Sequence, residues 1–154
     1  MKAEVYSVCI SRNDKYLVTG SQRDIKLWDF QEKELIYTFR KAHDGPITAL
    51  AISNKNGYLA SVSVDKAIKI WDVVYMDCLH IFRKAHDSRQ EWIWLSKIDP
   101  ISGVVISSDD RYIITHSTDQ VKIWDLNDAT CIHTINYPHE SKLFNNFVSD
   151  SKAD

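Results

Sequence analysis

Short stretches of alternating apolar and polar residues recur along this chain of 154 residues. Residues 25–29, 68–72 and 121–125 are the clearest, and each ends in a Trp-Asp pair. Alternation of this kind predicts a strand that buries one face. Turn-forming pairs such as Asn13-Asp14 and Asp109-Asp110 separate the stretches, and helical spacing is absent over any useful length. The pattern predicts an all-β chain.

Four sequence markers recur with one period. The Trp-Asp pairs begin at Trp28, Trp71 and Trp124, so 43 residues separate the first two and 53 separate the last two. A His follows each Trp by fifteen residues, a Tyr precedes it by twelve or thirteen, and a Ser precedes each Tyr by five. The hexapeptide Phe-Arg-Lys-Ala-His-Asp occurs twice, at 39–44 and 82–87. Markers that share one period indicate an internal repeat.

Each repeat contains four predicted strands. The third repeat is longer because eleven residues are inserted within 88–101, a segment that includes Trp92 and Trp94. We expect first strands at 6–11, 47–53 and 104–107, second strands at 16–21, 58–63 and 112–117, third strands at 25–29, 68–72 and 121–125, and fourth strands at 35–39, 78–82 and 131–135.

The period, the four strands per unit and the closing Trp-Asp pair resemble the WD-repeat β-propeller family. The resemblance covers nearly the whole chain and implies an all-β fold, a partial β-propeller of four-stranded antiparallel WD-repeat blades. Residues 1–154 then form a single WD-repeat region. Its repeats span approximately 1–42, 43–85 and 86–138, and 139–154 begin a fourth.

The resemblance also implies a buried polar network in each blade, made of a His, a Ser or Thr, an Asp and the Trp. A buried indole N–H and imidazole need hydrogen-bond partners, which explains this combination. In the first repeat Arg23 occupies the Asp position and no His is present. We therefore expect structural rather than catalytic histidines. The network positions are His43, Ser61, Asp65 and Trp71 in the second repeat, His86, Thr115, Asp119 and Trp124 in the third, and Thr19 and Trp28 in the first.

Composition excludes several function classes. The formal charge of −2 argues against bulk electrostatic binding of nucleic acid. The chain starts without a signal-peptide core and has no apolar run of membrane-spanning length, so we expect an intracellular protein, cytoplasmic rather than nuclear. Three cysteines without a Cys-x-x-Cys pair predict neither a disulfide framework nor a zinc site. Of these, Cys9 is expected to be buried.

No catalytic constellation stands out in the sequence. With four glycines the chain lacks a phosphate-binding glycine motif, and no nucleophile–base set has suitable spacing. His80 and His133 share one strand position and are expected to face solvent rather than to share a metal. We expect no enzyme activity, no cofactor, no metal and no small-molecule substrate.

Partner-binding residues are expected in the loops at one end of the blades, because rigid scaffolds place function there. The resemblance implies the recurrent positions Glu4, Tyr6, Gln22, Pro46, Thr48, Val64, Pro100, Ser102 and Thr118. Trp92 and Trp94 are two residues apart, so both indoles face one side of an extended segment. They are candidates for binding a partner, and burial against their own or a neighbouring blade is the alternative.

The leading expectation is a non-catalytic protein–protein interaction scaffold built from WD repeats, with a fragment of a longer propeller as one form of it. The alternative is a substrate-recruiting or structural subunit of a multiprotein enzyme complex, such as a ubiquitin ligase. Three blades in a row leave two apolar faces uncovered, which predicts self-association or a larger parent chain. Other proteins are therefore the expected partners.

Overall fold

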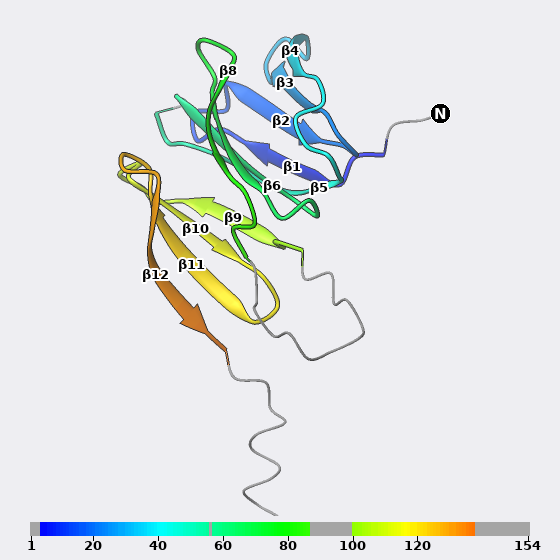
Figure 1. The fold of residues 1–154 in the computed structure, drawn as a ribbon. Coiled ribbons are helices and arrows are strands. Elements are labelled where there is room, and N and C mark those ends of the chain that lie inside the picture. The colour runs from blue at the N-terminus through cyan, green and yellow to red at the C-terminus, as the bar shows by residue number, and fades with distance from the viewer. Residues whose placement is uncertain (1–3, 56, 87–99, 138–154) are drawn as a thin grey trace, which may run out of the picture.

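A computed structural model describes residues 4–55, 57–86 and 100–137. These residues form three four-stranded antiparallel sheets, here called blades 1, 2 and 3 (Figure 1). Within each blade the strands pair in chain order, so each blade is a meander. Blade 1 contains β1 (Ser7–Ile10), β2 (Tyr16–Gly20), β3 (Ile25–Asp29) and β4 (Leu35–Phe39); blade 2 contains β5 (Ile47–Ile52), β6 (Tyr58–Ser63), β7 (Ile68–Asp72) and β8 (Asp77–Phe82); blade 3 contains β9 (Gly103–Ile106), β10 (Tyr112–His116), β11 (Gln120–Asp125) and β12 (Thr130–Asn136).

The predicted fold class is confirmed, since all twelve expected strands are present. The bounds of β3, β4, β6 and β7 coincide with the expected ones. Other strands differ by a residue or two at their ends, where turn hydrogen bonds compete with sheet pairing. Among the described residues no helix is long and apolar enough to span a bilayer.

The recurring Ser closes the first turn of each blade. Its hydroxyl oxygen accepts the backbone N–H of the Tyr five residues later, which fixes the turn between the first two strands. The three distances are 2.8 Å for Ser11 and Tyr16, 3.0 Å for Ser53 and Tyr58, and 2.8 Å for Ser107 and Tyr112. The fixed spacing of Ser and Tyr therefore has a local cause.

The Asp of each Trp-Asp pair closes the third turn. Asp72 Oδ1 accepts the backbone N–H groups of Val74 and Tyr75, both at 2.7 Å. Asp29 and Asp125 bind the two equivalent N–H groups of their own turns. The recurring Asp is thus explained by an Asx turn, without a catalytic or metal-binding role.

The hydrophobic core lies between blades. The middle blade contacts both others, because β5 lies against β1 on one side and β9 on the other. Phe39 stacks on Trp71 with 5.0 Å between ring centroids, and Phe82 stacks on Trp124 at the same distance. Each blade is therefore joined to the next by an aromatic pair. The buried residues are Val18, Ile25, Leu27, Phe39, Ala42, Ile47, Leu50, Leu59, Trp71 and Val73 between blades 1 and 2, and Ala60, Val62, Ile68, Ile70, Ala85, Ile101, Val104, Ile113 and Trp124 between blades 2 and 3.

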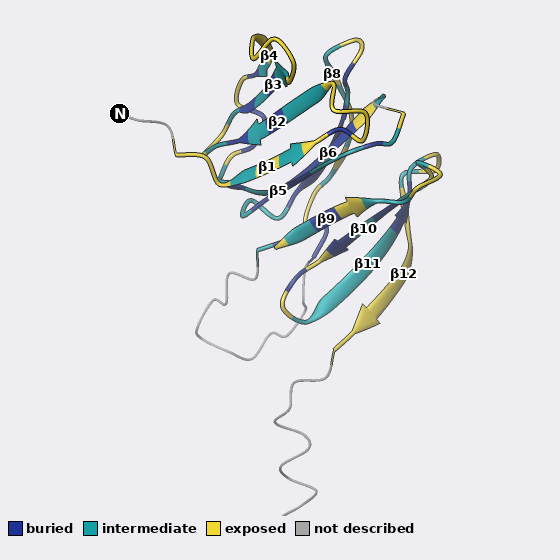
Figure 2. Ribbon diagram, turned by 180° about the vertical axis from the view of Figure 1, so that it is seen from behind, coloured by how far each residue is buried: buried dark blue, intermediate teal, exposed yellow. Residues whose placement is uncertain are grey.

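Burial falls off toward the outer blades. In Figure 2 the buried residues gather where blades face each other, whereas β12 is exposed along its whole length. Cys9 is half-buried, less than expected, and packs against the edge of the core between blades 1 and 2. Burial raises the pKa of its thiol to about 12.

Candidate functional site

In blade 2 the four expected network residues form one hydrogen-bonded chain. His43 Nδ1 lies 2.9 Å from Asp65 Oδ2, and His43 Nε2 lies 2.8 Å from Ser61 Oγ. Trp71 Nε1 donates to the same Ser61 oxygen at 2.8 Å. His43 and Ser61 are both fully buried. A neutral imidazole that donates from Nδ1 satisfies all four side chains, so the network is a packing device.

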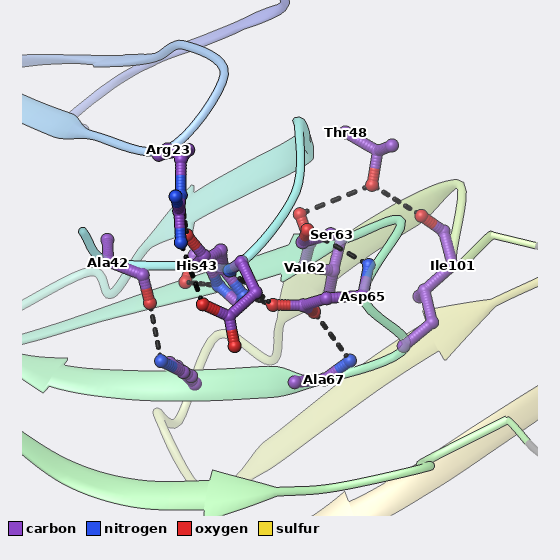
Figure 3. Close-up of polar contacts among 12 residues, drawn as sticks. Arg23, Ala42, His43, Thr48, Val62, Ser63, Asp65, Ala67 and Ile101 are labelled. Atoms are coloured by element: carbon purple, nitrogen blue, oxygen red, sulfur yellow. Dashed lines mark hydrogen bonds and ion pairs between the residues drawn. The ribbon is translucent and has the colours of Figure 1, made fainter.

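Asp65 fastens the loop before β5 to the turn after β6 (Figure 3). Its carboxylate also accepts the backbone N–H groups of Ala67 at 2.9 Å and Asp44 at 3.0 Å. Burial alone would raise the pKa of Asp65, but the hydrogen bonds from His43 and these two amides outweigh it and lower the pKa to about 2. Asp65 therefore remains a carboxylate over the whole neutral range.

Blade 3 repeats most of this network. His86 Nε2 lies 2.8 Å from Thr115 Oγ1, which also accepts the N–H of Trp124 at 2.9 Å. The expected contact between Asp119 and His86 is replaced by a bond from Ser117 Oγ to Asp119 at 3.0 Å. His86 Nδ1 is buried and has no partner among the described residues. Burial, together with the nearby Lys122 cation, lowers the pKa of His86 to about 4.

Blade 1 lacks a network His and uses its polar residues to hold blade 2. Trp28 Nε1 donates to Thr19 Oγ1 at 3.0 Å, as expected. Arg23 donates to Asp44 at 2.9 Å and to the His43 carbonyl at 3.3 Å. The Arg at the Asp position thus forms an inter-blade contact, which the side-chain pattern did not indicate.

A recurring Lys is a network member that sequence reasoning missed. Lys69 Nζ lies 5.7 Å from the centroid of the Trp71 ring and donates to the Ala42 carbonyl. Lys122 has the same two contacts, with Trp124 and the Ala85 carbonyl. A Lys two residues before each Trp was the available signal, since a cation held over an indole is favourable.

The structure brings the expected partner-binding positions together within each blade. Tyr6 donates to Glu4 at 2.6 Å, and this bond raises the pKa of Tyr6; Gln22 also bonds to the Tyr6 hydroxyl. Pro46 accepts the backbone N–H of Val64 at 3.1 Å. The corresponding positions of blade 3 include Ser102, which bonds to the Pro100 carbonyl at 3.2 Å, and Thr118, which is exposed.

Thr48 differs from the other positions in this set. Its single hydroxyl hydrogen can donate to the Ile101 carbonyl beside blade 3, at 2.5 Å, or to the Val62 carbonyl of its own blade, at 3.2 Å (Figure 3). Because Thr48 is half-buried and its hydroxyl is engaged by backbone, it joins blades rather than facing a partner. Trp92 and Trp94 lie outside the described residues.

Within the described ranges there is no group of three or more His, Cys, Asp and Glu side chains that could hold a metal ion. His80 is half-buried on β8 and His133 is exposed on β12, so the two lie on the outer strands of two different blades.

The blade geometry agrees with comparisons to known proteins. The family model described as WD domain, G-beta repeat matches residues 2–29 and 33–72. Two solved structures, "Crystal structure of RRP9 WD40 repeats" and "Structure of U3-55K", each share the fold with a TM-score of 0.73. Residues 2–72 thus belong to the WD40-repeat family, and the chain as a whole shares the fold of WD40 structures.

The likeness to these two structures concerns the fold, since the WD40 chain is 20% identical to the first and 19% to the second. Each match covers 91% of this chain, but 40% and 41% of the two neighbours. The WD40 chain thus spans about two fifths of their length. No curated protein matches it significantly.

Proposed function

We propose that this WD40 chain is a non-catalytic protein–protein interaction module. Its buried networks hold the blades rigid, and rigid display of loop side chains reduces the entropy lost when a partner binds. The clusters around Tyr6, Val64 and Ser102 come from equivalent positions of three blades and lie at the same blade end. An interaction module needs no catalytic histidine, which agrees with the place of His43 and His86 in the buried networks.

The observation that carries the proposal is the pair of uncovered blade faces. On the outer face of blade 1, Val8 is 63% and Phe30 40% exposed, and a pocket of about 340 Å³ lies beside Trp28. On the outer face of blade 3, Val105 is 57% and Ile135 42% exposed. Apolar surface of this kind in a soluble domain marks an interaction site.

The two faces are the two halves of one blade junction. Ile135 holds the strand position at which Phe39 and Phe82 stack on the Trp of the next blade. Trp28 is the Trp that has no such ring stacked on it among the described residues. We propose that further blades cover both faces, supplied by the rest of a longer chain or by a second copy.

Light scattering tests this part of the proposal. Burial of a few hundred Å² per face at about 25 cal/mol per Å² favours association by several kcal/mol before entropy losses. The 154-residue chain should therefore be dimeric or larger at micromolar concentration. Ile123→Lys, on the outer face of blade 3, should lower the mass, whereas the matched substitution Val74→Lys in an exposed turn should leave it unchanged. A monodisperse wild-type monomer would contradict the association.

Affinity capture with cross-linking tests the interaction role itself. A scaffold should cross-link to partner proteins through the loop end that carries Tyr6 and Ser102. A recruiting subunit of an enzyme complex, the alternative, should in addition bring catalytic subunits and a modified peptide. Turnover of hydrolase or transferase substrates by the purified chain alone would contradict both.

A further inference from the structure

The repeated hexapeptide contains two residues that packing does not explain. Its Phe, Ala and His positions are engaged in the core or the polar networks in both copies. Its Arg and Lys positions are exposed in both copies, and the same loop forms each time, with φ of 51° at Lys41 and 52° at Lys84. A matched pair of cations is therefore displayed at each junction, by Arg40 and Lys41 and by Arg83 and Lys84.

Backbone hydrogen bonds bring a third cation to each pair. The His43 N–H donates to the Arg23 carbonyl at 3.2 Å, and the Ala85 N–H donates to the Lys66 carbonyl at 3.0 Å. The turns after β2 and β6 thus lie directly beside the two loops. We call the resulting set the basic rim: Arg23, Arg40, Lys41, Lys66, Arg83 and Lys84.

Of the acidic residues beside the basic rim that the structure describes, Asp24 and Asp65 bind groups of the scaffold and Asp44 forms an exposed ion pair with Arg23. Asp24 accepts the backbone N–H of Lys41 at 2.8 Å, and Asp65 binds His43 and two amides. Asp44 pairs with Arg23 at 2.9 Å. The other five cations of the rim have no ion pair with any residue that the structure describes. Their charge is therefore available to a ligand.

The end of blade 3 provides an internal comparison. There the chain after β12 also lies beside the turn after β10, because the Tyr137 N–H donates to the Asp119 carbonyl at 2.8 Å. The two positions equivalent to the Arg-Lys pair carry Asn136 and Tyr137 there. The fold does not require cations at this place, so their presence at two adjacent junctions is a property of the surface.

We propose that the basic rim binds an extended acidic segment of a partner protein that crosses two neighbouring blade junctions. The proposal rests on the interaction role above and adds the chemistry of the partner. Arg guanidinium groups bind carboxylates in a bidentate manner, and Lys adds flexible point charges. None of the six rim residues is an aromatic platform for a base, which favours an acidic peptide over nucleic acid.

Fluorescence anisotropy with a labelled Glu-rich peptide tests the proposal on the 154-residue chain. Arg40→Gln/Lys41→Gln should weaken binding about tenfold, and Arg83→Gln/Lys84→Gln should do the same. The matched control is Arg12→Gln/Lys55→Gln, which removes the same charge from exposed positions at the opposite blade ends. It should change the affinity by less than about twofold. All these side chains are exposed, and circular dichroism checks that each variant is folded.

Four results would overturn the proposal. Equal weakening in the control would show that only the overall charge matters, and equal binding of a Gln-rich peptide would exclude charge recognition. Tighter binding of a single-stranded RNA of the same length would assign the basic rim to nucleic acid. If the rim variants still cross-link to the same partner proteins, the interaction role stands and the acidic-peptide proposal alone fails.

Discussion

Ser61→Ala tests whether the buried network of blade 2 stabilises the fold. The Ser61 oxygen is bonded to both His43 Nε2 and Trp71 Nε1, each at 2.8 Å. Removing it leaves two buried nitrogens unpaired, and each unpaired buried group costs about 1–3 kcal/mol. We therefore expect the free energy of unfolding to fall by about 2–5 kcal/mol.

Thr19→Val is the matched control in blade 1. Thr19 accepts one hydrogen bond, from Trp28, and both residues are half-buried, so the freed N–H can reach water. The loss should stay near about 1 kcal/mol. Val keeps the volume of Thr, which removes any cavity contribution.

Urea unfolding followed by far-UV circular dichroism measures both variants without relying on Trp fluorescence. The midpoint should shift far more for Ser61→Ala than for Thr19→Val at an unchanged m-value. Equal shifts would refute the reasoning, because the second hydrogen bond of Ser61 and its full burial would then carry no weight.

Four further outcomes follow from the same structure. Stability should fall as the pH decreases from about 6.5 to about 4, since the unfolded chain then binds a proton that folded His86 does not; urea midpoints at several pH values should show that His86→Gln removes this slope. Asp65 contributes to a second decline, from 3.8 to about 2, and Asp65→Asn should reduce it, while Asp109 and Asp125, whose pKa values are also lowered, keep the remainder. Ala129→Gly should stabilise by about 1 kcal/mol, because Ala129 has a φ of 52°; an unchanged melting temperature would contradict this strain. Trp71→Ala should cost about 3–5 kcal/mol and His80→Ala within about 0.5, and equal losses in urea unfolding would contradict their different burial.

The strands and turns could be predicted from the sequence because their causes are local. Alternation of apolar residues determines which face of a strand is buried, and residues two to five apart close the turns, as Ser53 and Asp72 do. The core between the blades was also predictable in kind, since an apolar face must be covered.

Contacts between segments distant in the sequence were not predictable at the same level. Asp65 and Asp119 occupy equivalent positions, yet one bonds to a His and the other to Ser117. Thr48 was expected to face a partner, but its hydroxyl lies within reach of the Ile101 carbonyl, 53 residues away. The acceptor to which a side chain bonds depends on how two blades are placed relative to each other. That placement cannot be read from the type of residue.

In a repeat fold most of the recurring residues stabilise the fold itself. The Ser and Asp residues close turns, and the Trp, His and Lys residues form the networks, so recurrence by itself indicates packing rather than function. Binding is then expected at recurring residues that make no packing contact, or at positions where repeats differ. Arg40 and Arg83 meet the first condition, and Trp28, against which no ring packs in the part of the chain that the structure describes, meets the second. The two conditions select different surfaces, a charged rim for a partner segment and an apolar face for another blade, so one can be occupied without blocking the other.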